Sequence, residues 1–210
     1  MHIDLGLRPT LTPGLDGEPR PLTRPLALLG VLLVAQSLHT VEHIAQWVQY
    51  HILGWPLKAS SGIISPLNAE VVHFVWNMGV LIVVVYLLEA GLRNRWMWLL
   101  LVWAAAHSAE HVYLFTNYVF EVWRLRMEGL PIGLAQGKPG FFGAGGLLGN
   151  IAPASPPVAW LCTLAPGLVE APRLDVHFWW NAGEVALLFP AALAALRPSA
   201  VDANEVAPFA

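Results

Sequence analysis

The sequence predicts an all-α integral membrane protein with four transmembrane helices arranged as two helical hairpins. Of its 210 residues, 56% are hydrophobic and only 12% are charged, whereas ordinary soluble domains carry about 25% charged residues. Four apolar segments are each long enough to cross a bilayer, for which ~20 residues suffice. Histidine motifs also recur in matching segments, which indicates an internal duplication.

The organisation can be placed along the chain. We predict a polar N-terminal arm over 1–24, spans over about 25–54, 69–92, 96–123 and 175–196, and a polar tail over 197–210. Asn68 and Asp175 have the side chains of helix N-caps and are expected to open the second and fourth spans. The charged sequence Arg93-Asn94-Arg95 predicts a tight turn between the second and third spans.

A long connection over roughly 127–173 separates the third and fourth spans. Its density of glycine and proline excludes a regular spanning helix. It is nevertheless apolar, with Phe141, Phe142 and Trp160 among its residues. We therefore expect it to fold onto the bundle mouth or to lie in the membrane interface, with one short helix near 156–164.

Basic residues near the span ends predict the orientation of the chain. Arg24, Arg93, Arg95 and Arg197 lie tight against helix ends on one side. The positive-inside rule then places both termini in the cytoplasm and the long loop outside, as expected for a bacterial inner membrane protein. The net charge of −3 offers no basic surface for nucleic acid.

The apolar segments align in pairs. The first and third align at an offset of 68 residues (His39 to His107), and the second and fourth at an offset of 104 (His73 to His177). His39-Thr-Val-Glu42-His43 thus returns as His107-Ser-Ala-Glu110-His111. Because both hairpins begin on the same side, we expect a parallel repeat with a pseudo-twofold axis along the membrane normal.

The polar residues of these segments share helix faces and depth. Positions i, i+3 and i+4 point the same way on a helix. With a rise of 1.5 Å per residue, the polar groups lie ~18–30 Å from the cytoplasmic arginines, in the outer half of a hydrocarbon core ~30 Å thick. A charged Glu42 or Glu110 would cost ~2.5–3.5 kcal/mol at mid-membrane. Polar residues at such depth indicate a functional site.

This layer predicts a metal site. Imidazole and carboxylate suit iron, copper and zinc, and an i, i+4 histidine pair can chelate one ion. The predicted ligands, enough for two ions, are His39, Glu42, His43, His73, His107, Glu110, His111 and His177. We expect the two glutamates to bridge the ions or to balance charge. Asn77, Asn181 and Glu184 are expected behind the ligands, where they orient the imidazoles.

The motifs at 39–43 and 107–111 resemble the histidine boxes of integral-membrane non-haem di-iron hydroxylases and desaturases. The resemblance implies oxygenase or hydroxylase chemistry on a lipophilic substrate, with an electron donor as partner. Those families pair adjacent histidines, whereas here a glutamate precedes the last histidine. The spacing also matches the inverted zinc-protease motif, with glutamate as general base, although a protease needs one such motif and this chain has two.

Two alternatives remain open at the level of sequence. Histidines on facing helices suit a bis-histidine haem b, with Trp76 and Trp180 against the macrocycle, but haem leaves the glutamates unexplained. The layer is also compatible with a non-enzymatic role, as a structural network or as a path for protons or metal ions. Membrane lipid is an expected partner of the spans, and a homo-oligomer is a further candidate.

Overall fold

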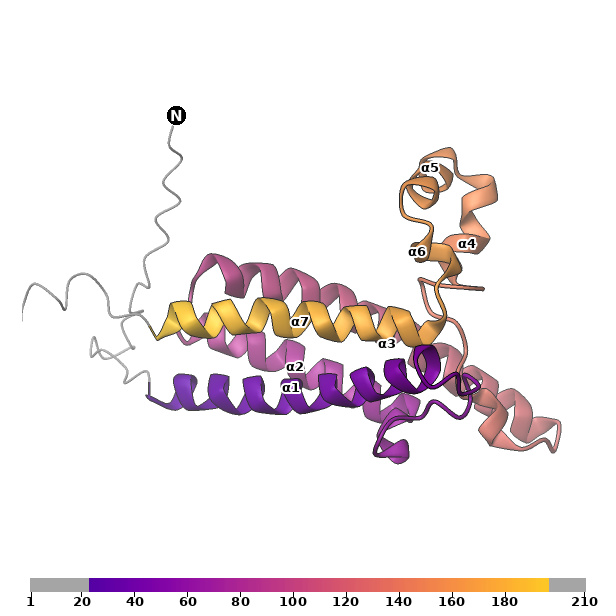
Figure 1. Ribbon diagram of the computed structural model, residues 1–210, viewed down its shortest axis with the longest axis horizontal. Coiled ribbons are helices and arrows are strands. Elements are labelled where there is room, and N and C mark those ends of the chain that lie inside the picture. Colours follow the sequence, from indigo (N-terminus) through magenta and orange to yellow (C-terminus); the bar gives the residue numbers. More distant parts are fainter. Residues whose placement is uncertain (1–22, 197–210) are drawn as a thin grey trace, which may run out of the picture.

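The computed structural model describes residues 23–196, which form an all-helical structure without strands. Four long helices run side by side along the longest axis (Figure 1). They are α1 (Thr23–His51), α2 (Glu70–Glu89), α3 (Arg95–Met127) and α7 (Arg173–Ala195). The predicted tail and nearly all of the predicted arm lie outside the described residues.

The four long helices coincide with the predicted spans to within a few residues, but two predicted caps are wrong. Asn68 belongs to a 3₁₀ turn (Ser65–Asn68), so α2 begins after Ala69 instead. α7 begins at Arg173, with Pro172 at the N-cap position, so Asp175 lies in the first turn and not at the cap. At the predicted charged turn, Asn94 caps α3 by accepting a hydrogen bond from the backbone N–H of Met97 at 3.0 Å.

The two ends of the bundle differ. At one end, α1 begins, α7 ends, and a short turn joins α2 to α3 (Figure 1). In that turn Gly91 has a φ of +98°, which stops α2 at little steric cost. At the other end lie the connections 52–69 and 128–172. We call these the turn end and the loop end.

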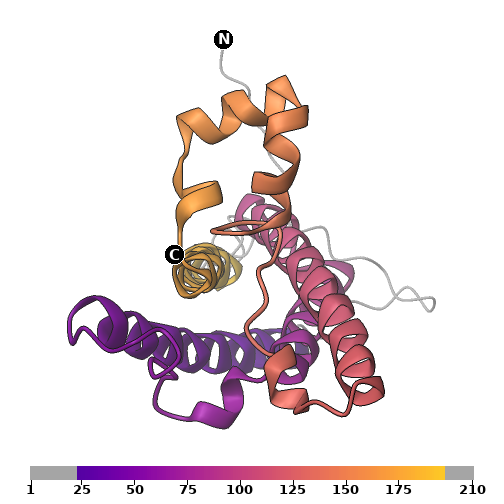
Figure 2. The ribbon, with the colours of Figure 1, turned by 90° about the vertical axis from the view of Figure 1, so that its right-hand side faces the viewer.

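The long connection folds into short helical pieces. They are a 3₁₀ turn (Ile132–Ala135), α4 (Leu147–Ile151), a second 3₁₀ turn (Ala152–Ala154), α5 (Pro156–Leu164) and α6 (Gly167–Glu170). The helix predicted near 156–164 is therefore confirmed as α5. Together α4, α5 and α6 form a lobe that projects sideways from the loop end of the bundle (Figure 2).

Three of the four pairs of neighbouring long helices pack closely. α1 packs on α7, α7 on α3, and α3 on α2, whereas α1 and α2 touch only slightly. The turn-end half has an ordinary apolar core. Its fully buried members include Leu87, Met97, Leu100, Leu188 and Ala191. The loop-end half is filled with polar side chains instead, and these build the site described next.

The outward-facing sides of the four long helices carry many apolar side chains. α1 and α2 are long and apolar enough to cross a membrane. Large apolar side chains on all four helices point outward, and Val31, Val75, Val102 and Phe189 are 64%, 62%, 69% and 55% exposed. A soluble helical bundle shows the reverse pattern, with its apolar stripe inside and its polar face in water.

Candidate metal centre

Six histidines from all four long helices meet in the loop-end half of the bundle. They are His39 and His43 of α1, His73 of α2, His107 and His111 of α3, and His177 of α7. Each is at most 8% exposed. Neighbouring rings lie 4.7–6.0 Å apart between centroids. We call these six residues the His cluster.

Four of the six rings use Nδ1 to donate a hydrogen bond. The bonds run from His43 to Gln46 Oε1 (3.0 Å), from His73 to the Ala69 carbonyl (3.3 Å), from His107 to Glu184 Oε1 (2.9 Å) and from His177 to the Arg173 carbonyl (3.1 Å). Because these oxygens only accept, Nδ1 carries the proton and Nε2 keeps its lone pair. Nε2 is the atom that each of these rings can offer to a cation.

Two pairs of Nε2 atoms have the spacing of ligands to one ion. The Nε2 atoms of His39 and His43 lie 3.2 Å apart, and those of His107 and His111 lie 3.1 Å apart. Nitrogens bound tetrahedrally at ~2.0–2.1 Å are separated by ~3.3 Å. His73 completes the first pair, because it offers a ligand atom within 4.8 Å of ligand atoms of both His39 and His43.

The remaining Nε2 atoms lack a partner. Those of His73 and His177 are buried and make no hydrogen bond within the described part of the chain. An unsatisfied buried polar atom costs ~1–3 kcal/mol. A bound cation would satisfy both atoms, because each keeps its lone pair.

The cluster has two halves, His39 with His43 and His73, and His107 with His111 and His177, and the contacts around them match in pairs. The rings of Trp76 and His39 lie 5.1 Å apart, and those of Trp180 and His107 lie 5.2 Å apart. The matching hydrogen bonds run from Thr40 Oγ1 to the Asn181 carbonyl (3.4 Å) and from Ser108 Oγ to the Asn77 carbonyl (3.2 Å). These are the residue pairs that the offsets of 68 and 104 relate.

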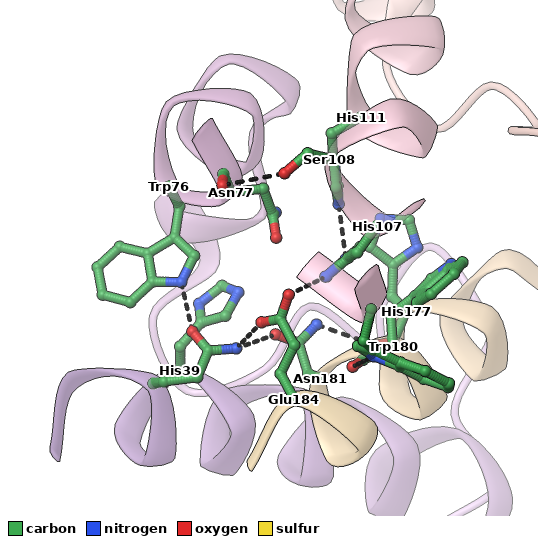
Figure 3. Close-up of polar contacts among 12 residues, drawn as sticks. His39, Trp76, Asn77, His107, Ser108, His111, His177, Trp180, Asn181 and Glu184 are labelled. Atoms are coloured by element: carbon green, nitrogen blue, oxygen red, sulfur yellow. Dashed lines mark hydrogen bonds and ion pairs between the residues drawn. The ribbon is translucent and has the colours of Figure 1, made fainter. Parts of the chain in front are cut away.

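One half of the cluster also hydrogen-bonds to a buried polar network that the other half lacks. The side-chain amide of Gln36 donates to Glu184 and to Asn181 Oδ1, and its Oε1 accepts from Trp76 Nε1 at 2.7 Å. Figure 3 labels the three partners of Gln36, which are Trp76, Asn181 and Glu184. The other oxygen of Glu184 accepts a hydrogen bond from the Nδ1–H group of His107. The network therefore ties α1, α2, α3 and α7 together around one carboxylate.

The corresponding positions in the other half are apolar. The same offsets put Ala104 where α1 has Gln36, and Val80 where α7 has Glu184. As a result Asn77 Oδ1 receives no hydrogen bond in the described residues, whereas its counterpart in Asn181 does. The two halves of the cluster thus share a layout but differ in charge.

Glu42 and Glu110 face the loops. The backbone N–H of Ile64 donates to Glu42 Oε1 at 2.8 Å. The backbone N–H of Phe141 donates to both carboxylate oxygens of Glu110, at 3.0 and 3.1 Å. Each glutamate thereby holds one outer connection onto the bundle, and the structure does not bring either carboxylate into the group of close ligand atoms.

A glycine lies against each of these carboxylates. A Cβ atom on Gly62 would be 2.0 Å from Glu42 Oε1, and one on Gly140 would be 1.9 Å from Glu110 Oε1. Gly62 also has a φ of +84°, where side chains are strained. Both loops therefore need glycine to approach the bundle.

Three buried acids have no lysine or arginine as partner within the described residues. Glu42, Glu110 and Glu184 are 5%, 1% and 1% exposed. The ion pairs of lysine and arginine within the described residues involve other acids, such as Glu70, which pairs with Arg173. A buried carboxyl group is either protonated or compensated by a nearby positive charge, and a cation bound in the His cluster would supply that charge.

The remaining predicted residues lie behind the cluster. Asn77 and Asn181 each donate from Nδ2 to the carbonyl of the histidine one turn earlier, at 2.9 Å, so the donor groups of their amides bind backbone and not an imidazole. Of the three residues expected there, Glu184 is the one whose side chain contacts an imidazole. Sequence reasoning missed Gln36, although it shares a helix face with Thr40 and His43.

Comparisons with protein-family models, with curated proteins and with solved structures find no match to this chain. The geometry of the His cluster is therefore the basis for assigning a function.

Proposed function

We propose that the chain is an integral membrane metalloprotein whose His cluster binds two transition-metal ions. The observation that carries this proposal is the set of Nε2 lone pairs in a buried core, two of which have no partner. Imidazoles held for structure alone would be expected to pair both ring nitrogens. Ions bound by the Nε2 atoms would give those of His73 and His177 a partner, whereas the buried Nδ1 of His111 makes no hydrogen bond within the described residues in either case.

The two ions would occupy the two halves of the cluster. One would bind His39, His43 and His73, whose ligand atoms lie within 4.8 Å of one another. The other would bind His107, His111 and His177. Glu184 would fix the His107 ring through Nδ1, as carboxylates behind metal-bound histidines do. Glu42 and Glu110 would balance charge from the loop side, and they remain candidates for a bridging role.

For the membrane arrangement we propose four spans, α1, α2, α3 and α7, with the turn end in the cytoplasm. The apolar side chains exposed along all four helices support this, as do the arginines near the turn end. We also propose that the chain arose by duplication of a two-helix hairpin. The paired contacts of Trp76 with His39 and of Trp180 with His107 support that origin.

As the reaction class we propose oxidoreductase chemistry, with oxygen-dependent hydroxylation of a lipophilic substrate as its specific form. A ligand set dominated by neutral imidazole suits iron and copper as well as zinc, and iron or copper would supply redox chemistry when bound. An electron donor is then a required partner. The close ring-to-ring packing of the six histidines favours ions over haem b, because a macrocycle would have to separate those rings.

The proposal is tested by elemental analysis and absorption spectroscopy of detergent-purified full-length protein. We expect about two equivalents of iron, copper or zinc, and no Soret band. His43→Ala should lose the ion of the first half and His111→Ala that of the second. His51→Ala is the matched control, because His51 is an exposed histidine of α1 that pairs with Asp175 outside the cluster.

Protein that takes up no metal after growth in supplemented medium and after direct titration would refute the metal assignment. A Soret band would select haem b instead. Retention of both ions by His43→Ala/His111→Ala would show that the ligands lie elsewhere. Metal binding without oxygen consumption or a redox-dependent spectrum would remove the oxidoreductase proposal and leave transport or a structural role.

A further inference from the structure

An apolar groove runs along the open side of the bundle, between α1 and α2. It has a volume of about 500 Å³, within the range of ~300–1,000 Å³ typical of small-molecule sites. Its lining residues on α1 are Leu28, Val31, Leu32 and Ala35, and those on α2 are Val71, Val72, Val75, Trp76, Gly79, Val80 and Val83. Apart from the indole N–H of Trp76, none of these side chains is polar.

The matching interface between α3 and α7 is filled at the level of Gly183, whereas nearer the loop end it opens into a pocket lined by Trp103, Trp179, Trp180 and the lobe. There the Trp103 indole covers Gly183 so closely that a Cβ atom on this glycine would be 2.3 Å from the ring. The offsets relate Trp103 to Ala35 and Gly183 to Gly79. A Cβ atom on Gly79 would meet no atom within 4 Å. The groove therefore lies where the chain has alanine in place of a tryptophan.

This comparison indicates what the groove can hold. At the level of Gly183 a single indole fills the corresponding space, so at Gly79 the groove is about one side chain wide, whereas a helix with its side chains is ~10–12 Å across. Along α2 it extends from Val71 to Val83, ~18 Å at the rise of a helix. Its walls, including Val31 and Val75, belong to the outward-facing apolar surface of the two helices most suited to a membrane.

We propose that this groove binds one linear acyl chain of a membrane lipid. The chain would lie parallel to the helices, as acyl chains do in a bilayer, with Trp76 as the inner wall. The Trp76 ring is 5.1 Å from that of His39, and its Nε1 is fixed by Gln36. A bound acyl chain is thus separated from the His cluster by one indole ring. The groove is complete without metal, so this inference does not depend on the proposed ions.

The test is photo-crosslinking of the full-length protein in phosphatidylcholine vesicles. The probe is palmitic acid with a mid-chain diazirine, and labelled residues are located by mass spectrometry. We expect labelling to concentrate on the groove residues of α1 and α2. Ala35→Trp, which copies the filled interface, should reduce that labelling at least tenfold, the factor lost with about two buried methylene groups.

Matched controls distinguish filling of the groove from disruption of the fold. Val102→Trp adds the same side chain to an outward-facing position of α3 that is 69% exposed, and it should leave labelling of the groove unchanged. Gly79→Leu fills the groove from the opposite wall, where there is open space, and should act like Ala35→Trp. Metal content is measured on the same samples, so that unsubstituted protein without metal but with intact groove labelling would refute the metal site and leave the groove proposal standing.

Four results would overturn the acyl-chain proposal. The first is equal labelling of all four helices, which would show a lipid-exposed surface without a site. The second is unchanged groove labelling in folded Ala35→Trp and Gly79→Leu proteins. The third is efficient disulfide formation between two copies of Val75→Cys protein, which would show that a second copy covers the groove. A sterol diazirine probe should label the groove weakly, and labelling equal to that by palmitic acid would refute selection of a linear chain.

Discussion

Glu184 Oε1 accepts a hydrogen bond from His107 Nδ1 at 2.9 Å, and these side chains are 1% and 0% exposed. The contact fixes the His107 ring so that Nε2 faces His111. No such acid serves His39, because the related residue on α2 is Val80. The two halves of the cluster should therefore hold their ions with different strength.

Replacing Glu184 should weaken one ion selectively. Glu184→Val removes the acceptor of the His107 Nδ1 proton, and loss of such a partner typically lowers metal affinity by ~10–100-fold. Glu184→Gln keeps an acceptor oxygen and should have a smaller effect. Competition titration with a chromophoric chelator measures both affinities. Equal weakening of the two ions, or no weakening, would contradict this assignment of Glu184.

Gln36 and Glu184 should be energetically coupled. Gln36→Ala leaves the Trp76 N–H and the Oε2 atom of Glu184 without their partner, at a cost of ~1–3 kcal/mol each. The double substitution Gln36→Ala/Glu184→Val copies the Ala104 and Val80 pair of the other half. Its loss of stability should be smaller than the sum of the two single losses by ~0.5–3 kcal/mol. Reversible unfolding in detergent tests this, and simple additivity would contradict it.

The two related glycines should respond differently to alanine. Gly183→Ala places a methyl group against the Trp103 ring and should destabilise the protein by ~1–3 kcal/mol. Gly79→Ala meets open space and replaces a helix-interior glycine, so it should be neutral or stabilise by up to ~1 kcal/mol. Thermal unfolding of the two variants decides the point. Equal effects would mean that Trp103 is free to move aside.

Gly140→Ala should release the long connection from α3. The added methyl group would displace Glu110 or the loop, and the two hydrogen bonds from the Phe141 N–H would break. Limited proteolysis should then cut within 128–146 at a higher rate. Gly133→Ala is the matched control, because a Cβ atom there meets nothing within 4 Å. Similar cleavage of both variants would show that the Glu110 contact does not hold the loop.

Helix positions were predictable because they depend on local pattern. Long apolar segments with polar ends specify where α1, α2, α3 and α7 lie, and histidines at i and i+4 share a face whatever the neighbouring helix is. His39 and His43 therefore point together for reasons that the sequence contains. The same spacing accounts for His107 and His111.

The surroundings of the cluster depended on contacts between distant segments. Glu42 lies at the edge of the stripe that carries His43, so its direction was decided by the N–H group of Ile64, twenty-two residues away. Likewise, Gln36 meets Glu184 because α1 packs on α7, and no local pattern specifies which helices become neighbours. The short helices of the lobe show the same limit, since only α5 was long enough to be predicted.

The pairing of α1 with α7 has a consequence for biosynthesis. α1 emerges first from the ribosome and α7 last, yet Gln36 and Thr40 of α1 find their partners on α7. Until α7 is present, α1 has little backbone contact with its neighbour α2, and Gln36 lacks the Asn181 and Glu184 side chains that accept its hydrogen bonds. The histidine layer can therefore form only after α7 has been synthesised, and a chain that stops before Arg173 would leave α1 without its main docking partner.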